Sequence, residues 1–378
     1  MQKNLEKTYF PNLNGIRFIA AFFVFIHHLE QFKYLYKIDN FSNDYPFIKL
    51  IGKLGVVLFF VLSGFLITYL LLAEEKLNSQ INIKKFYIRR ILRIWPLYFL
   101  ILFSGLFIIP NLNFIVTPFF NQDIFNNDPF KIILIFIFFL PNLAYAIFGL
   151  IPYVSHTWSI GTEEQFYLIW PVLLKFTKNK LRIIVLVIIF YLTFKFLLYT
   201  NFLDFISFKN LILQFWLTFN IDCMAIGGLF SYLVFKKSKL LRYLMNKFSF
   251  YITLISLCFF LYFRLDFLFF HYEVYAILFG IIILNLSSNN SFSRILENNI
   301  FNFLGKISFG IYMYHPFAII LTINIFIYFN FINNLAILFL SLVITLVLSG
   351  FSFFYFEKFF LIKKNKYLVL KLTQNNTT

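Results

Sequence analysis

Residues 12–32 read NLNGIRFIAAFFVFIHHLEQF, an apolar segment that carries one arginine and two adjacent histidines. An α-helix turns by about 100° per residue, so a position eleven residues further along returns to within roughly 20° of the same face. Arg17 and His28 have this spacing, which places both side chains on one side of a helix, about 16 Å apart along its axis. Because charged and titratable side chains are costly in lipid, the pair predicts a functional site inside a membrane.

The composition indicates an integral membrane protein. Of the 378 residues, 61% are hydrophobic and only 13% are charged, whereas a soluble domain has about 25% charged residues. Apolar runs of about 20 residues recur along the chain, which is typical of helical membrane proteins rather than of β-barrels. The sequence therefore predicts an all-α, polytopic transmembrane bundle of about ten spans. The expected spans lie near 13–33, 54–73, 94–116, 160–175, 182–200, 212–235, 249–264, 269–287, 304–328 and 335–357.

Lysine and arginine gather in the loops between these runs. If the N-terminus is cytoplasmic, the basic loops at 76–93, 175–182 and 236–247 and the basic segment 358–371 all lie in the cytoplasm, as the positive-inside rule expects. The placement of basic loops on the cytoplasmic side therefore explains the net charge of +17. In a soluble protein such a charge would suggest binding to nucleic acid. We predict no nucleic-acid partner and two cytoplasmic termini. Residues 1–360 are treated as one transmembrane domain, and residues 361–378 as a short basic and polar tail that is expected to be frayed.

One apolar stretch does not fit the alternation of loops. Residues 131–151, KIILIFIFFLPNLAYAIFGLI, could form an eleventh span, but every later loop would then change sides. Pro141 and Asn142 interrupt the middle of the stretch. We therefore expect it to be re-entrant, dipping into the bundle and returning to the outer side, with a proline-kinked span as the alternative.

The chain has two cysteines, Cys223 and Cys258, both within apolar stretches. No spacing in the sequence is typical of a metal site or of a disulfide framework. We therefore expect both cysteines to be packing residues and predict no metal cofactor.

Four motifs, taken in order, resemble the membrane acyltransferase-3 family. They are NGIRFIAAFFVFIHH (14–28), GVVLFFVLSGFLITYLL (55–71), FYIRRILRIWPLYFL (86–100) and HTWSIGTEEQFYLIWPVLL (156–174). A weaker fifth, GKISFGIYMYHPF, covers residues 305–317. The resemblance implies a bacterial enzyme of the inner (cytoplasmic) membrane that acylates surface glycans, peptidoglycan, lipids or antibiotics, in the form without a fused hydrolase-like domain.

Two positions depart from the family pattern. Val57 stands where many members carry an aspartate, and the pair His27-His28 stands where many have a single histidine. By register the catalytic position of the family maps to His28. On a helix His27 points about 100° away from it.

The resemblance assigns His28 as the base that removes a proton from an acceptor hydroxyl, for which the ordinary pKa of about 6.5 is suitable. His28 could act directly or become an acyl-imidazole, and the sequence leaves both routes open. Arg17 is expected to bind the donor or to polarise its carbonyl group. The alternatives are a helix-packing histidine and an arginine that reaches the lipid headgroups.

Arg89, Arg90 and Arg93 open the third expected helix from the cytoplasmic side, and spacings of three and four bring Arg93 beside the other two. Forked guanidinium donors suit phosphates. The resemblance implies that this cluster binds acyl-CoA, with acetyl-CoA as the first expectation, as the co-substrate. The alternative is charge that only sets topology.

Adjacent carboxylates cannot face the same way on a helix, so either Glu163 or Glu164 is expected to point inward. Family register favours Glu164 as a catalytic carboxylate that orients the histidine, with Glu163 near the acceptor. Trp158, Asp222 and His315 are further candidates for binding the acceptor, although interfacial and packing roles are alternatives. Lys195 lies within an expected span and has no obvious partner in the sequence.

These features predict an O-acyltransferase that moves an acyl group from cytoplasmic acyl-CoA to a hydroxyl of a surface polysaccharide or lipid-linked glycan. The thioester is expected to reach His28 through the bundle, and the glycan to approach from the other side. The alternatives are a transporter or flippase of a lipid-linked sugar, and an enzyme that acylates a small molecule or a membrane lipid. The acceptor and the oligomeric state stay open.

Overall fold

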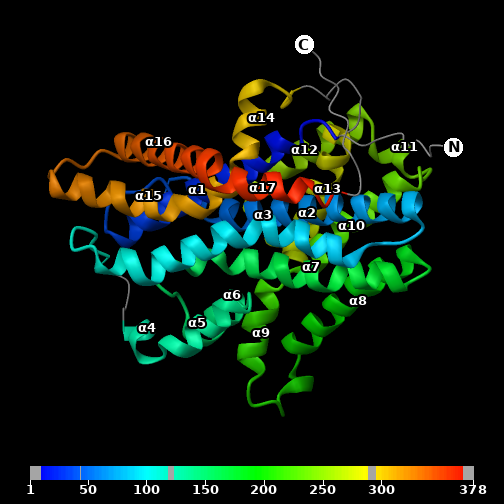
Figure 1. Cartoon of the computed structure of the whole chain (residues 1–378), viewed down its shortest axis with the longest axis horizontal. Coiled ribbons are helices and arrows are strands. Elements are labelled where there is room, and N and C mark those ends of the chain that lie inside the picture. Colours follow the sequence, from blue (N-terminus) through cyan, green and yellow to red (C-terminus); the bar gives the residue numbers. More distant parts are fainter. Residues whose placement is uncertain (1–9, 43, 118–122, 288–294, 369–378) are drawn as a thin grey trace.

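The computed structural model describes residues 10–42, 44–117, 123–287 and 295–368. Within these ranges the regular elements are all helices, and no strand occurs among them. Most of the long helices run side by side along the longest axis of the molecule, whereas α9 (Lys209–Thr218) and α14 (Asn299–Lys306) cross that direction (Figure 1). The predicted all-α membrane bundle is therefore confirmed.

Eight helical segments of the described chain are long and apolar enough to cross a membrane. Four of them are single helices: α1 (Leu13–Leu35), α2 (Ile48–Asn78), α8 (Lys180–Tyr199) and α15 (Ser308–Tyr328). Two segments include one long helix each: Ile83–Asn111 begins with α3 (Ile83–Phe103), and Leu268–Ser287 contains α13 (His271–Ser287). The last two are Lys209–Phe235, which ends with α10 (Ile221–Phe235), and Asn334–Asn365, which contains α16 (Asn334–Ser352) and α17 (Lys358–Asn365). Two further expected spans appear as α7 (Trp158–Phe176) and the shorter helix α12 (Lys247–Tyr262).

The stretch at 131–151 does not form a straight span. It forms α5 (Pro129–Ile137) and α6 (Pro141–Phe148), each about 13 Å long, against a hydrocarbon core of about 30 Å. Pro141 is the first residue of α6, where a proline without an N–H is tolerated. The amide of Gln165 on α7 donates to the carbonyl oxygen of Phe139 at 2.8 Å, so the break between the helices keeps a hydrogen-bond partner inside the bundle.

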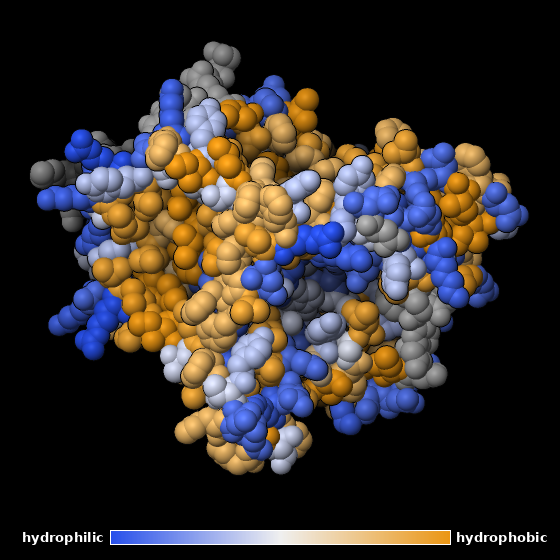
Figure 2. Space-filling model, turned by 180° about the vertical axis from the view of Figure 1, so that it is seen from behind, coloured by the Kyte–Doolittle hydropathy of each residue, from blue (hydrophilic) through white to orange (hydrophobic). Residues whose placement is uncertain are grey.

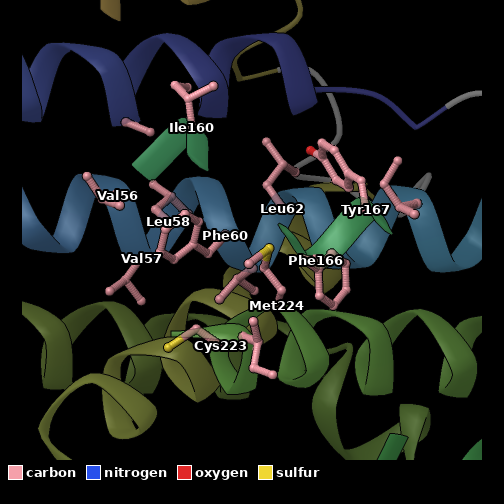
Figure 3. Packing of buried hydrophobic residues seen from close by; sticks show 14 of the residues in the cluster. Val56, Val57, Leu58, Phe60, Leu62, Ile160, Phe166, Tyr167, Cys223 and Met224 are labelled. Atoms are coloured by element: carbon pink, nitrogen blue, oxygen red, sulfur yellow. The ribbon is translucent and has the colours of Figure 1, made fainter. Parts of the chain in front are cut away.

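The centre of the bundle is the contact between α2 and α10. A Cβ atom on Gly64 would lie 1.8 Å from the carbonyl oxygen of Met224, and one on Gly227 would lie 2.0 Å from that of Val61. Glycine at both positions therefore lets the two backbones approach closely, a recurrent device in membrane bundles. Met224 lies between the two helices (Figure 3). This contact fixes α2, along which the candidate site is built.

Hydrophobic residues cover much of the face turned away from the viewer of Figure 1, and hydrophilic residues gather at its edges and around a hollow near its middle (Figure 2). Large apolar side chains such as Phe205, Phe208 and Leu268 are 71–82% exposed. A soluble protein could not carry so much exposed apolar surface, whereas lipid covers it in a membrane.

The C-terminal part differs from the expectation of a frayed tail after residue 360. Helix α17 continues to Asn365 and lies beside α3 (Figure 1). The backbone of Tyr367 is held by a side chain of α3. Residues 369–378 of the expected tail lie outside the described residues.

Candidate active site

A cavity of about 620 Å³ lies between α1, α2, α3, α7 and α15. It extends along α2 from Ala73 to Val56, about 26 Å by the helical rise. The Ala73 end lies near α17, because Arg89 pairs with Glu74 of α2 and also holds the carbonyl oxygen of Tyr367. Towards the Val56 end, the cavity is lined by Phe59 and Tyr312, whose rings lie side by side. Its polar lining residues are Asn14, Arg17, Ser63, Tyr69, Arg90, Arg93, Ser159, Glu163, Tyr167, Ser308, Tyr312 and Asn365.

Three arginines face this cavity. Arg17 donates to the Oδ1 atom of Asn14 at 3.1 Å, and the guanidinium of Arg90 lies 5.5 Å from the ring centre of Tyr167. The Nε atom of Arg90 is buried without a hydrogen-bond partner. Within the described parts of the chain, none of the three arginines forms an ion pair with a carboxylate. The cavity therefore has an excess of positive charge that suits an anionic ligand.

Glu163 is the carboxylate that lines the cavity. Its Oε1 atom accepts from the Ser63 hydroxyl at 2.7 Å, and its Oε2 atom accepts from the Tyr167 hydroxyl at 3.2 Å. Two donors on different helices hold the group in place, so its direction is set by tertiary contacts between α2 and α7.

Glu164 points elsewhere. Its Oε2 atom accepts from the indole N–H of Trp95 at 2.9 Å, and its Oε1 atom is buried without a partner. It does not line the cavity and has no hydrogen bond to His28. One of the two carboxylates does point inward, as expected, but the structure brings Glu163 rather than Glu164 to the arginines. Neighbouring side chains on a helix diverge by about 100°, and the Ser63 and Trp95 partners decide between them.

Arg89 is separated from the other two arginines of α3. It forms an ion pair with Glu74 of α2 at 3.3 Å and donates to the carbonyl oxygen of Tyr367 at 3.0 Å. It does not line the cavity. Its contacts tie α2, α3 and the chain after α17 together, so Arg90 and Arg93 line the cavity and Arg89 does not.

His28 lies next to His315. The Nδ1 atom of His28 is 2.6 Å from the Nε2 atom of His315, and the Nδ1 atom of His315 is 3.1 Å from the carbonyl oxygen of Ile311. Because a carbonyl oxygen only accepts, His315 carries its proton on Nδ1 and its Nε2 atom accepts from His28. The Nε2 atom of His28 is then unprotonated and can accept a proton from a substrate.

His28 and His315, called the histidine pair below, lie just beyond the inner end of the cavity. His27 packs against Gly52 of α2, one helical turn past Val56, and its Nδ1 atom is 3.0 Å from the carbonyl oxygen of Ile48. Neither His27 nor His28 lines the cavity. His28 as a whole residue is half-buried.

Tyr312 lines the cavity and also lies next to His315, so it stands between the cavity and the histidine pair. Its ring centre lies 5.8 Å from that of His315 and 6.0 Å from that of Phe59. Its hydroxyl donates to the carbonyl oxygen of His156 at 2.7 Å and is 2.6 Å from the Ser159 hydroxyl. A passage is expected between the arginines and His28, but His28 does not line the cavity, and Tyr312 is the lining side chain whose ring lies next to His315.

The remaining candidates lie outside this cavity. The ring of Trp158 lies under the Lys53 ammonium, 4.0 Å away, and is half-buried. Asp222 is fully buried and its Oδ1 atom has no hydrogen-bond partner. Lys195 pairs with Glu273 of α13 at 2.7 Å, a partner 78 residues away that the sequence did not suggest. Among the residues that the structure describes, no group of histidine, cysteine or acidic side chains could hold a metal ion.

Several lining residues had no assigned role in the sequence. Ser63 stands in an otherwise apolar run of α2, and Ser159 lies beside Trp158 in the fourth motif. Tyr312 shares the fifth motif with His315. A polar residue inside an apolar helix is the signal that could have pointed to Ser63.

Comparisons with known proteins show that the chain is similar to acyltransferases. The family model described as an acyltransferase domain matches residues 10–353. The chain is 33% identical over 194 residues to "Peptidoglycan O-acetyltransferase OatA" of Listeria monocytogenes, a match that covers 48% of this chain and 28% of the relative. It is 29% identical over 180 residues to "Putative peptidoglycan O-acetyltransferase YrhL" of Bacillus subtilis, covering 46% and 25%. The chain thus matches about a quarter of the length of these relatives, and no solved structure matches it.

Proposed function

The chain belongs to the family of membrane acyltransferases that this domain model describes, and we propose that it moves an acyl group, acetyl in the simplest case, from acyl-CoA to a hydroxyl of a cell-surface glycan. The names of two relatives make peptidoglycan the first acceptor to test. Other surface polysaccharides and lipid-linked glycans have the same reacting group, and the proposal extends to them.

The observation that carries the proposal is the cavity on which Arg17, Arg90 and Arg93 converge. Three guanidinium groups that form no ion pair with the carboxylates of the described residues, inside an apolar bundle, suit phosphates that bind through forked donors. A transporter of an uncharged sugar has no need of this charge. A flippase of a lipid-linked sugar handles a phosphate as well, so the transfer assay below is what distinguishes that alternative. The cavity is also long and narrow, about 26 Å along α2, which fits a donor whose phosphates and reacting thioester lie far apart.

The proposed chemistry uses the free Nε2 atom of His28. It takes the proton of the acceptor hydroxyl while the hydroxyl oxygen attacks the thioester carbonyl carbon. The new C–O bond forms the ester, the C–S bond breaks, and the thiolate of coenzyme A takes up the proton from the imidazolium. The products are the O-acyl ester and free coenzyme A, and His28 returns to its neutral form. His315 holds His28 in the required tautomer. Arg17 lies about 16 Å from His28 along α1 and donates to Asn14, so its role in this scheme is to bind the donor and not to stabilise the oxygen of the tetrahedral intermediate.

Orientation follows from the basic loops. With the basic start of α3, which carries Lys84 and Lys85, on the cytoplasmic side, the arginine end of the cavity lies towards the compartment where acyl-CoA is made. The histidine pair then lies towards the outer side, where the glycan is found. We place the protein in a bacterial inner membrane with both termini in the cytoplasm.

Transfer by the purified full chain in lipid nanodiscs tests the proposal. Radiolabelled acetyl-CoA and soluble peptidoglycan fragments are the substrates. His28→Asn is expected to lower the rate by at least about 100-fold, because the base is lost. His27→Asn is the matched control, since the amide keeps a donor at the position of the ring Nδ1 atom, and it should retain activity. Equal rates for His28→Asn and the wild type would overturn the assignment.

A further inference from the structure

The inner end of the cavity, meaning the part that α2 lines from Val56 to Leu62, has an apolar wall. It is about 9 Å long by the helical rise. Ser63 comes directly after it and holds Glu163, the carboxylate of the cavity. The side chains that α2 and α7 contribute to the apolar wall are Val56, Phe59, Phe60, Leu62 and Ile160. Figure 3 shows Ile160 level with this part of α2, and Tyr167 farther along the helix. The inner end therefore suits a hydrocarbon group and not a phosphate.

Two aromatic rings form the wall of the inner end where α2 faces α15. The planes of the Phe59 and Tyr312 rings make an angle of 81°, so the edge of one ring meets the face of the other. Tyr312 is held by two hydrogen bonds, because its hydroxyl donates to the carbonyl oxygen of His156 and accepts from the Ser159 hydroxyl. Ser159 also lines the cavity, and this bond uses its proton. Any movement of the Tyr312 ring would break both bonds, so the wall keeps its place.

A close contact between α1 and α2 ends the cavity beyond Val56. A Cβ atom on Gly55 would lie 2.7 Å from the carbonyl oxygen of Ala20 and 2.9 Å from a methyl group of Val24. A Cβ atom on Gly52, about one turn earlier in α2, would overlap the ring of His27. The two helices are in van der Waals contact here, which leaves no room between them for a longer hydrocarbon chain.

Phe59 is the wall residue whose size most directly limits this space. Its ring is half-buried, lines the cavity, and packs against a small cluster that contains Ala21 of α1 and Ile311 of α15. Phe60 is only 1% exposed and its ring meets that of Trp158 edge-on, at 6.2 Å between the ring centres. Phe59 makes no hydrogen bond with its side chain, unlike Tyr312, so shortening it enlarges the inner end without breaking one.

We propose that the inner end is the subsite for the acyl chain and that Phe59 sets the longest chain that can enter it. This rests on the proposed function, because it takes the ligand to be an acyl thioester whose phosphates bind Arg17, Arg90 and Arg93. With the phosphates at the arginines, the thioester end of the donor extends towards Val56. The closed apolar end then accepts a short acyl group such as acetyl. A six-carbon chain adds four methylene groups that overlap the Phe59 ring.

Binding of coenzyme A, acetyl-CoA and hexanoyl-CoA to the purified full chain in lipid nanodiscs tests the subsite. Coenzyme A has no acyl group, so it reports the remaining contacts alone. The wild type is expected to bind hexanoyl-CoA at least about tenfold more weakly than acetyl-CoA, because extra methylene groups are forced into a packed site. In Phe59→Ala hexanoyl-CoA should gain at least about tenfold, the effect of burying two methylene groups. Coenzyme A should stay within about twofold of its wild-type affinity, because its phosphates bind elsewhere in the cavity.

Leu66→Ala is the matched control. Leu66 lines the same cavity about one turn past Ser63, on the side away from Val56, so its truncation widens the cavity outside the inner end. The ratio of the affinities for hexanoyl-CoA and acetyl-CoA should not change in this variant. Phe59→Leu shortens the wall by less than alanine does and should give an intermediate ratio, which keeps the test available if Phe59→Ala does not fold. An equal shift in Leu66→Ala and Phe59→Ala would contradict the role of Phe59.

The outcomes separate this proposal from the proposed function. If the wild type binds hexanoyl-CoA as tightly as acetyl-CoA, or if Phe59→Ala leaves the ratio unchanged, the acyl subsite is wrong and the proposed function is unaffected. If Phe59→Ala shifts the ratio but the wild type transfers no acetyl group to a glycan, the subsite stands and the proposed function is wrong. If the wild type binds neither coenzyme A nor its thioesters, both are wrong.

Discussion

The Nδ1 atom of His28 lies 2.6 Å from the Nε2 atom of His315, although 287 residues separate the two along the chain. The rings are nearly parallel, with an angle of 5° between their planes. Because the Nδ1 atom of His315 faces the Ile311 carbonyl oxygen, this contact fixes the proton of His28 on Nδ1. A second histidine here takes the place that a carboxylate has in many catalytic histidine sites.

The first prediction concerns this pair. His315→Leu removes the acceptor for His28 and is expected to lower kcat by about 10- to 100-fold, with little change in KM for acyl-CoA. His315→Gln should restore most of kcat, because its amide oxygen can accept from His28. Steady-state transfer assays measure both constants. A loss that appears in KM alone would mean that His315 serves the donor cavity instead.

The second prediction concerns the barrier at Tyr312. Tyr312→Ala removes the ring that separates the cavity from His315 and opens a path for water to the thioester. We expect release of acetate from acetyl-CoA without acceptor to rise several-fold. Tyr69→Ala enlarges the cavity at its other end and is the control, in which hydrolysis should not rise. Unchanged hydrolysis in Tyr312→Ala would show that the tyrosine does not separate the donor from the histidines.

The third prediction distinguishes the two adjacent carboxylates. Glu163→Gln removes the charge that lines the cavity and is expected to lower transfer at least about tenfold, through altered positions of Ser63 and Tyr167. Glu164→Gln keeps an oxygen for the Trp95 N–H and should retain most of the activity. Parallel assays of the two variants decide between them, and the reverse order would restore Glu164 to the catalytic role that the sequence predicted.

The fourth prediction concerns the centre of the fold. Gly64→Ala places a methyl group 1.8 Å from the Met224 backbone oxygen, so α2 and α10 must separate. We expect a loss of about 3 kcal/mol or more, seen as a lower Tm in detergent. Gly350→Ala is the control, since nothing lies within 4 Å of its Cβ position. There the change should be neutral or slightly stabilising. Equal Tm values for both variants would contradict the close helix contact.

Much of the bundle could be predicted from apolar runs and prolines. The break at Pro141 was visible because proline cannot continue a helix from the residues before it. The place of the arginines on α3 followed from their spacing of three and four. These are local properties of single helices, and the sequence displays them directly.

Contacts between distant helices could not be predicted in this way. The choice of Glu163 over Glu164 depends on Ser63, which lies 100 residues away. Arg89 left the cluster because Glu74 of α2 pairs with it. The pairing of Lys195 with Glu273 likewise joins two spans that the sequence alone does not bring together. In each case the partner is set by how helices pack, which helical spacing does not encode.

The positions of Arg17 and His28 depend both on the spacing within one helix and on contacts with other helices. Their spacing of eleven residues does place both on α1, as expected. Arg17 lines the cavity, however, while His28 faces α15 and lies past Tyr312. The spacing in the sequence predicts that the Arg17 and His28 side chains lie on one side of the same helix. Tyr312, which stands between the cavity and the histidine pair, belongs to α15, and this spacing does not predict its position.

The most direct test of the account is the ester content of the cell surface. Cells that express the wild-type chain, His28→Asn or His27→Asn are compared by mass spectrometry of their purified peptidoglycan and surface polysaccharide, with protein levels matched by immunoblot. The account predicts a glycan O-acyl ester in cells with the wild type and with His27→Asn, and its loss in cells with His28→Asn. An unchanged ester in cells with His28→Asn would contradict it.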